Sequence, residues 1–480
     1  MLIFLNLLSF ASFGAEPIEK KIDGIIYRLE KHTNDDGTLT GTLTISKDKD
    51  VKDDTMPERE VSADGVNKTI GRNSIQDDDN TVTTIIIEDG ITKIGNNVFQ
   101  NCKKLTSITI PNSVTKIGDS AFNGCIALES IAIPNSVTDI GWSVFYGCKA
   151  LKSIIIPNSV TDIGWTVFYD CTALESVTMS DNVTSIGNYT FQNCSSLTSI
   201  IIPSKVTDIG NQAFSGCSKL RSVIILDGVT SISGMAFKGC TALESVTIPN
   251  SVTSIDYFAF QNCSSLKSII IPSKVTYIGL FVFNGCTALE SVTIQNGVKS
   301  IDYGAFQNCS SLKSIIIPNS VTNIYSSAFE GCTALNSGDV YYLGTEAKWD
   351  NITIYDKNDP LTSAKRHDSC NILTVNKVWK DNDDSGLRCE PTFVLYKLNS
   401  GGGHDKINNE DGEKYKEWEV TYVNGLPVEF DNATGKVING DGAEKDVWLC
   451  KFIIFDHVAD NKYAVSEDPM VGYTSSAPTP

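Results

Sequence analysis

Histidine is scarce in this chain of 480 residues, and its scarcity limits the chemistry that the chain can perform. The 4 histidines lie far apart in the sequence, at His32, His367, His404 and His457. A Ser/His/Asp or Cys/His site needs a histidine beside its nucleophile, so scattered histidines make such a site hard to assemble. A phosphate-binding glycine loop is also missing from the sequence. We therefore predict that the protein is not an enzyme and carries no cofactor.

Basic charge is outnumbered, with 39 lysine and arginine residues against 57 aspartate and glutamate residues and a formal net charge of -18. This balance excludes nucleic acid as a partner, because neutralising phosphates needs a basic face. Beyond the N-terminal residues, no stretch approaches the ~18 apolar residues that a membrane span needs. We expect an acidic, soluble surface and a monomer, with a membrane involved only through an anchor that the sequence does not show.

The N-terminal residues depart from this composition. "MLIFLNLLSFASFGA", residues 1–15, is an apolar run followed by small residues, which is typical of a secretory signal peptide cleaved near Gly14 or Ala15. No lysine or arginine precedes the run, so a buried or disordered N-terminal segment stays open as the alternative. Export predicts an extracellular or cell-surface location.

Cysteine is abundant, and its spacing reveals a repeat. Of 14 cysteines, those from Cys102 to Cys332 recur every 23 residues. Each has a phenylalanine three residues before it and a leucine three residues after it, and a strand-like Ser-Ile-x-Ile follows in most copies. A fixed period of this length indicates a solenoid, in which each unit buries its apolar face against its neighbours. We predict short parallel strands, with a single helical or 3₁₀ turn between each phenylalanine and cysteine.

The repeated unit reads V-T-x-I-G-x-x-A-F-x-x-C-x-x-L-x-S-I-x-I-P-x-x and closely resembles the BspA-like leucine-rich-repeat family over roughly Thr81–Asp356. The resemblance implies a leucine-rich-repeat solenoid of about 11 copies at residues 81–338. Flanking stretches resemble the ends of such proteins, with an N-terminal cap region at 16–80 and a C-terminal capping unit at 339–369. Caps are physically required, because the end repeats would otherwise expose their core to water.

The cysteine column admits three interpretations. Equivalent stacked residues have parallel Cβ vectors, which disfavours disulfides, and a row without histidine partners does not supply the tetrahedral cluster that zinc needs. We expect buried apolar thiols and no metal, with some disulfides or a metal as the open alternatives. A bond between Cys389 and Cys450, outside the column, is a further alternative.

The 23-residue period is lost at residues 370–480, where alternating strand-like stretches predict a small β-sandwich. "VNKVWKDNDDSGLRCEPTFVLYK" at 375–397, with "YAVSEDPMVGYTSS" near the end, resembles a collagen-adhesin B-type (Cna-B) domain that is truncated before its final strand. The resemblance implies an isopeptide lysine at Lys377 and an assisting acid at Glu467. Because the amide partner would lie on the missing strand, we expect an ordinary strand lysine and a solvated turn residue instead.

Outward-facing apolar residues are the candidates for partner binding. An exposed apolar column usually marks an interaction surface, and tryptophan and tyrosine dominate interaction hot spots. The opposing interpretation is that the aromatic residues merely cover the convex face. The candidates on the predicted strands are Ile155, Ile201, Ile224, Ile270 and Ile316. The aromatic candidates are Trp142, Tyr146, Trp165, Tyr169, Tyr257 and Tyr303.

The BspA-like resemblance implies adhesion, so we predict an exported surface protein that binds partner proteins through its solenoid. The expected partners are extracellular matrix proteins, host cells or the surfaces of other bacteria. The domain at 370–480 would then serve as a stalk. The alternative is a passive structural spacer or envelope-layer scaffold.

Overall fold

The computed structural model describes residues 17–22, 25–34, 38–47 and 82–368, and beyond these the backbone of the strands between residues 371 and 467. The chain divides into two compact units. The first unit consists of Met1–Ile315, Ser320–Gly338 and Thr353–Ala364. The second unit consists of Ile316–Asn319, Asp339–Ile352 and Lys365–Pro480. The predicted signal peptide at residues 1–15 lies outside the described residues.

The first unit begins with a small antiparallel sheet. It consists of β1 (Ile18–Ile22), β2 (Ile25–Thr33) and β3 (Leu39–Lys47), with β2 between its neighbours. Residues alternate along β2 and β3, so that Leu29, Leu43 and Ile45 are buried. β3 then pairs in parallel with β4 (Val82–Ile87), whose residue Thr84 is in register with Ser107 of the following repeat. The antiparallel sheet therefore covers the edge of the first repeat strand.

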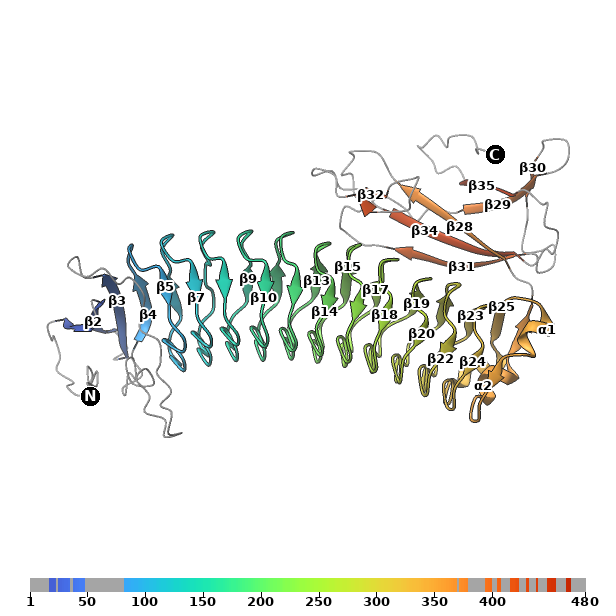
Figure 1. The fold of residues 1–480 in the computed structure, drawn as a ribbon, viewed down its shortest axis with the longest axis horizontal. Coiled ribbons are helices and arrows are strands. Elements are labelled where there is room, and N and C mark those ends of the chain that lie inside the picture. Colours follow the sequence, from blue (N-terminus) through green and yellow to red (C-terminus); the bar gives the residue numbers. More distant parts are fainter. Residues whose placement is uncertain are drawn as a thin grey trace. The chain divides into compact units, whose positions relative to one another are not determined.

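Residues 82–338 form a solenoid in which equivalent residues of successive repeats lie side by side (Figure 1). Most repeats contribute a strand that begins at the serine of the repeat pattern, and neighbouring strands of this kind pair in parallel with serine opposite serine, as in Ser199↔Ser222. The repeat of Cys125 has no strand at its serine, Ser130. For the repeat region the predicted fold class is confirmed as a β-solenoid of about 12 turns with repeats of about 23 residues, whereas the small β-sandwich expected at residues 370–480 stays a prediction. These strands are β6 (Ser107–Thr109), β9 (Ser153–Ile155), β11 (Ser176–Thr178), β13 (Ser199–Ile202), β15 (Ser222–Ile225), β17 (Ser245–Thr247), β19 (Ser268–Ile271), β21 (Ser291–Ile294) and β23 (Ser314–Pro318).

A second, shorter strand in each repeat pairs in parallel with its neighbours and forms further parallel sheets. It spans the two residues before the glycine position, and its isoleucine points into the core. The sequence pattern predicts only the longer strand, because two residues are too few to show an alternating period. The short strands are β5 (Lys93–Ile94), β7 (Lys116–Ile117), β8 (Asp139–Ile140), β10 (Asp162–Ile163), β12 (Ser185–Ile186), β14 (Asp208–Ile209), β16 (Ser231–Ile232), β18 (Ser254–Ile255), β20 (Tyr277–Ile278), β22 (Ser300–Ile301), β24 (Asn323–Ile324) and β26 (Thr353–Ile354).

The core is a continuous column of phenylalanine rings beside a column of thiols. The rings of Phe145 and Phe168 stack with their centroids 5.4 Å apart and 9° between their planes, and the other ladder phenylalanines from Phe99 to Phe329 repeat this arrangement. All the column cysteines are free, and all except the partly exposed Cys102 are buried. The Sγ of Cys171 donates a hydrogen bond to the carbonyl of Phe145, 3.1 Å away. The interpretation as buried thiols is therefore confirmed from Cys125 to Cys332.

The segment from phenylalanine to cysteine is a single 3₁₀-type turn, as predicted. The amide of Cys148 donates to the carbonyl of Phe145 at 3.0 Å, and the amide of Leu151 donates to that of Cys148 at 3.2 Å. The turn does not extend into a helix, because the residue before each cysteine has a left-handed backbone, with a φ of 69° at Gly147.

The last repeat ends in η1 (Thr333–Ser337), and α2 (Asp359–Ser363) follows it within the first unit. Asn358, at the start of α2, is buried. Its Oδ1 accepts a hydrogen bond from the Phe329 amide at 3.0 Å, and its Nδ2 donates to the carbonyls of Tyr325 and Tyr355, each 2.9 Å away. Elsewhere in the stack the phenylalanine amide donates to the next repeat, as Phe306 does to the Ala328 carbonyl, so Asn358 takes the place of a further repeat at the Phe329 amide.

The second unit holds β25 (Asp339–Leu343), α1 (Glu346–Trp349) and β27 (Lys365–His367). β25 and β27 are parallel, and the Arg366 guanidinium lies 5.4 Å from the ring centroid of Trp349. Further strands form antiparallel pairs. These are β28 (Asn371–Val378), β29 (Phe393–Leu398), β30 (His404–Lys406), β31 (Tyr415–Tyr422), β32 (Glu429–Phe430), β33 (Val437–Ile438), β34 (Val447–Ile454) and β35 (Tyr463–Glu467).

Several predictions fall on this C-terminal part and stay predictions. Lys377 lies on β28 and Glu467 on β35, but their side chains are outside the described residues, as are the side chains of Cys389 and Cys450. The resemblance to a collagen-adhesin B-type domain is likewise untested. Across the helices that the structure describes, none has the length and apolarity to cross a bilayer.

Candidate binding surface

The aromatic candidates lie on one edge of the solenoid, which we call the turn face. It is formed by the residues three before, two before and one after each ladder phenylalanine, such as Trp142, Ser143 and Tyr146 around Phe145. The residue two before the phenylalanine has a left-handed backbone, with a φ of 55° at Ser143. This conformation turns the Ser143 amide toward the next repeat, where it donates to the carbonyl of Trp165 at 3.0 Å.

Trp142 and Trp165 form the most exposed aromatic pair of the turn face. Their rings stack with centroids 5.5 Å apart, yet the two residues are 59% and 53% exposed. Glycine in the following repeat provides the room, because a Cβ at Gly164 would lie 2.8 Å from Cδ1 of Trp142, and one at Gly187 would lie 2.7 Å from Cδ1 of Trp165. Tyr146 and Tyr169 stack beside them in another column, 4.7 Å apart, and are half-buried.

A second aromatic cluster lies four repeats further on. Phe258 and Phe281 stack at 5.2 Å, and the rings of Tyr257 and Tyr303 meet them edge-on at 5.8 and 5.2 Å. The two phenylalanines thus join the predicted candidates Tyr257 and Tyr303 into one group. Leu280 is exposed between the two tyrosines in the same column and is absent from the sequence-based candidates. Its position three before Phe283 is the signal that would have identified it.

Acidic residues accompany this second cluster. Asp256 and Asp302 immediately precede Tyr257 and Tyr303 in the sequence. Burial raises the pKa of both carboxyl groups, and a hydrogen bond from Ser300 partly offsets this effect at Asp302. The Lys238 ammonium lies over the Phe258 ring, 5.7 Å from its centroid. The cluster therefore combines apolar rings with charges of both signs.

The isoleucine candidates lie on the longer strands and behave differently along the stack. Ile155 is 67% exposed, Ile201 is also exposed, and Ile224 and Ile270 are half-buried. The expectation that Ile316 faces solvent is wrong, because this residue is fully buried. Ile316–Asn319 belongs to the second compact unit, unlike the strands that hold the other isoleucine candidates. The exposed column therefore ends before this residue.

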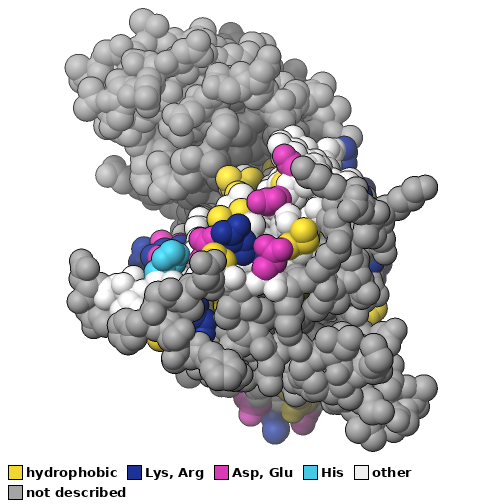
Figure 2. Space-filling model, turned by 90° about the vertical axis from the view of Figure 1, so that its left-hand side faces the viewer, with side chains coloured by type: hydrophobic (Ala, Val, Ile, Leu, Met, Phe, Trp, Pro, Cys, Tyr) yellow, Lys and Arg dark blue, Asp and Glu magenta, His cyan; other side chains and the backbone are white. Residues whose placement is uncertain are grey.

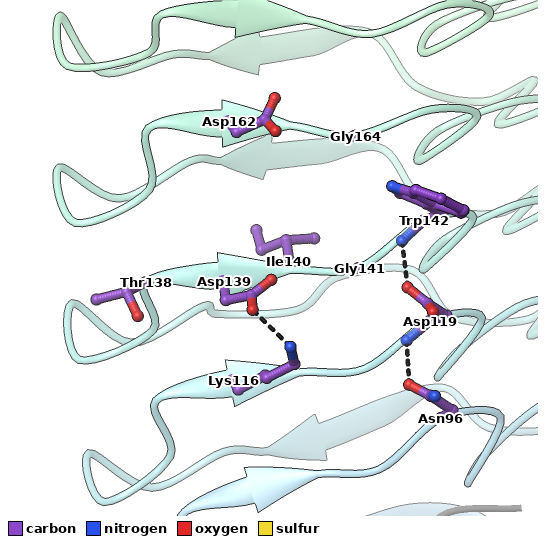
Figure 3. A pocket seen from close by; sticks show the side chains of 10 residues that line it. All are labelled: Asn96, Lys116, Asp119, Thr138, Asp139, Ile140, Gly141, Trp142, Asp162 and Gly164. Atoms are coloured by element: carbon purple, nitrogen blue, oxygen red, sulfur yellow. Dashed lines mark hydrogen bonds and ion pairs between the residues drawn. The ribbon is translucent and has the colours of Figure 1, made fainter.

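A depression of about 480 Å³ lies beside Trp142 on the turn face. We call it the Trp142 depression and define it by Asn96, Lys116, Asp119, Asp139, Trp142 and Asp162. Figure 3 shows Lys116, Asp139 and Asp162 in one column and Asn96, Asp119 and Trp142 in another, with Gly141 and Gly164 between them. The acids are absent from the sequence-based candidates, although Asp139 and Asp162 occupy equivalent positions 23 residues apart.

Hydrogen bonds hold both columns of the Trp142 depression. The Asp119 amide donates to Oδ1 of Asn96 at 2.7 Å, and the Trp142 amide donates to Oδ1 of Asp119 at 2.8 Å. The Lys116 ammonium pairs with Oδ2 of Asp139 at 2.6 Å. Elsewhere, seen from the β2–β4 end, acidic and basic side chains are interspersed on the described surface (Figure 2). The Trp142 depression differs in holding three carboxylates and one ammonium group.

This fold defines the class of the protein as a leucine-rich-repeat solenoid, and comparison identifies the family. The sequence profile of the BspA type leucine rich repeat region matches residues 68–197, 120–240 and 208–336. The chain belongs to this family. No curated protein matches the chain.

Solved structures of other bacterial repeat proteins are similar to the chain. A leucine-rich cell surface protein from Faecalibacterium prausnitzii is 30% identical, covers 71% of this chain and 99% of its own, and has a TM-score of 0.38. A leucine-rich repeat protein from Bacteroides ovatus is also 30% identical, with coverages of 72% and 91% and a TM-score of 0.41. The pneumococcal vaccine antigen PcpA is 19% identical, with coverages of 72% and 98% and a TM-score of 0.36.

Proposed function

We propose that this chain is a non-enzymatic bacterial surface protein that binds partner proteins through its turn face. The exposure of the stacked pair Trp142 and Trp165 carries the proposal. Burying an exposed large apolar side chain in an interface contributes on the order of 1.5–3 kcal/mol. Stacking has already ordered the two rings, so little side-chain entropy remains to be lost on binding.

The proposed partners are extracellular matrix proteins or proteins on host or bacterial cell surfaces. A similar protein of F. prausnitzii is described as a cell surface protein, which supports an extracellular or surface location for this chain. Residues 1–15 would act as the export signal, and residues 370–480 would act as a stalk. The solenoid suits such a role because its repeats present an extended surface on a rigid core.

The test measures binding of the purified chain to immobilised matrix proteins, such as fibronectin and fibrinogen, by surface plasmon resonance. The double variant Trp142→Ala with Trp165→Ala should weaken binding at least about tenfold, which corresponds to about 1.4 kcal/mol. Its thermal melting should stay close to that of the parent, because both residues are more than half exposed.

Ile155→Ser with Ile201→Ser is the matched control, since it also removes exposed apolar area but on the strand face. If only this control variant loses affinity, the binding surface lies on the strands, and the assignment of binding to the turn face is wrong. If the parent chain binds none of the matrix proteins or cell surfaces tested, a spacer or scaffold role replaces the proposal.

A further inference from the structure

We infer that the Trp142 depression binds a guanidinium group, supplied by an arginine side chain of the partner protein. The inference rests on the proposed function and adds the chemistry of the contact. The first observation is that one face of the Trp142 ring is uncovered. One face of its indole ring stacks on Trp165, whereas the preceding residue of the same column is the short Asp119. The ring therefore stays 59% exposed.

An exposed indole ring attracts cations more strongly than any other aromatic side chain does. The charge around Trp142 favours a cation as well, because Asp119, Asp139 and Asp162 outnumber Lys116. The Asp162 carboxylate has no hydrogen-bond or ion-pair partner among the described residues. Asp139 remains half exposed although it pairs with Lys116. The chain as a whole, with a formal net charge of -18, adds a long-range attraction of the same sign.

The two glycines of the depression bring the ring and the carboxylates to the same space. A Cβ at Gly164 would collide with the Trp142 ring, and a Cβ at Gly141 would collide with Oδ1 of Asp119. No side chain therefore separates the acid column from the tryptophan column, as Figure 3 shows. The volume of about 480 Å³ is within the range of small-ligand sites.

A guanidinium group fits this arrangement better than an ammonium group. It is planar and weakly hydrated, so it can stack on the indole while its edge donates hydrogen bonds to carboxylates. A neutral saccharide could also stack on the ring but would gain no ionic attraction from the acids. The two ligand classes therefore differ in charge, and the experiment compares a charged probe with neutral ones.

The test uses the full chain labelled with 5-fluorotryptophan and observed by ¹⁹F NMR, with the Trp142 signal assigned through Trp142→Phe. The probes are N-acetyl-arginine methylamide, the corresponding citrulline compound, which is a neutral near-isostere, and cellobiose. The arginine probe should shift the Trp142 signal saturably, with an affinity at least about tenfold above that of citrulline. The affinity should fall as salt rises from about 50 to about 500 mM, because exposed charges are screened.

Asp162→Asn should weaken arginine binding, whereas Asp208→Asn should not. Asp208 has the equivalent position on β14, where the neighbouring column holds Asn211 instead of tryptophan. Equal affinities for arginine and citrulline, a response to cellobiose alone, or no shift of the Trp142 signal would each overturn the inference. If the arginine probe fails while Trp142→Ala with Trp165→Ala still loses the partner protein, the proposed function stands and only the partner chemistry is wrong.

Discussion

Each column cysteine from Cys125 to Cys332 is buried, and hydrogen bonds such as that from Cys148 Sγ to the Phe122 carbonyl, 3.3 Å away, recur along the stack. Burial removes water from these thiols and so disfavours the charged thiolate. It raises the pKa of Cys148, Cys217 and Cys286 to about 12. At the residue scale these cysteines are therefore unreactive packing groups, because the thiolate is the form that attacks oxidants and metals.

This burial predicts a loss of stability at alkaline pH. Below about pH 9 the thiol is neutral in both the folded and the unfolded chain, whereas between about pH 9 and pH 12 only the unfolded chain ionises at Cys148. The free energy of unfolding should therefore fall through this window, and Cys148→Ala should reduce the slope by about 1.4 kcal/mol per pH unit. Urea unfolding at a series of pH values measures the slope of the free energy of unfolding with pH. Val144→Ala, a buried change without a titrating group, should leave the slope unaltered, and equal slopes in both variants would contradict the burial argument.

At the scale of the element, the turn of each repeat depends on two left-handed residues. One lies directly before the cysteine and is always glycine, asparagine or aspartate, such as Gly124 or Asp170, which tolerate this conformation best. The other lies two before the phenylalanine and includes Tyr189 and Phe258, with φ values of 60° and 58°. The second position carries no recognisable residue signature, so only the first could be anticipated from sequence.

Alanine substitutions at two glycines distinguish the cost of backbone strain from the cost of a steric collision. Gly147 has a φ of 69°, and a Cβ added there would meet no atom within 4 Å, so Gly147→Ala should cost about 1 kcal/mol from the backbone alone. Gly124, with a φ of 76°, faces Oδ1 of Asn101, and Gly124→Ala should cost at least about 1 kcal/mol more. Urea unfolding compares the two variants. Equal costs would mean that the Asn101 side chain moves aside freely.

At the scale of the whole molecule, the solenoid has ends that must be closed. Each repeat contacts only its neighbours, so a defect at an end should loosen the nearest repeats without unfolding distant ones. Asn358 is the clearest closing residue, because its side chain satisfies three backbone groups of the last turn. The stacked phenylalanine rings and the paired parallel strands connect this last turn to the repeats before it.

Asn358→Ala should destabilise the C-terminal end of the solenoid by about 3 kcal/mol, since it removes three hydrogen bonds and leaves the amide of the buried Phe329 without its acceptor. Native-state hydrogen exchange should show faster exchange in β22 and β24, with β7 and β10 unchanged. Asn351→Ala is the matched control, because this asparagine is exposed and its side chain bonds only to the Ala347 carbonyl among the described residues. Uniformly faster exchange in all repeats would show that the solenoid unfolds as one cooperative unit.

The sequence by itself determined the period, the register and the core of this protein. Phe191, Cys194 and Leu197 are buried as their spacing predicts, because a strict 23-residue repeat makes every unit meet its neighbour in the same way. In a repeat protein the contacts of one unit predict those of every other unit, whereas in other folds the contacts between residues distant in sequence must be known separately. The core residues can therefore be predicted from the sequence alone, without information on tertiary contacts.

Only the tertiary structure decided which outward residues share a surface. Asp139 and Asp162 join Trp142 in one depression because glycines open the space between two columns. Ile316 is buried and belongs to the second unit, although its position within the repeat matches that of the exposed Ile155. The direction of an outward side chain depends on backbone conformation and on neighbours beyond the repeat, and a periodic pattern contains neither.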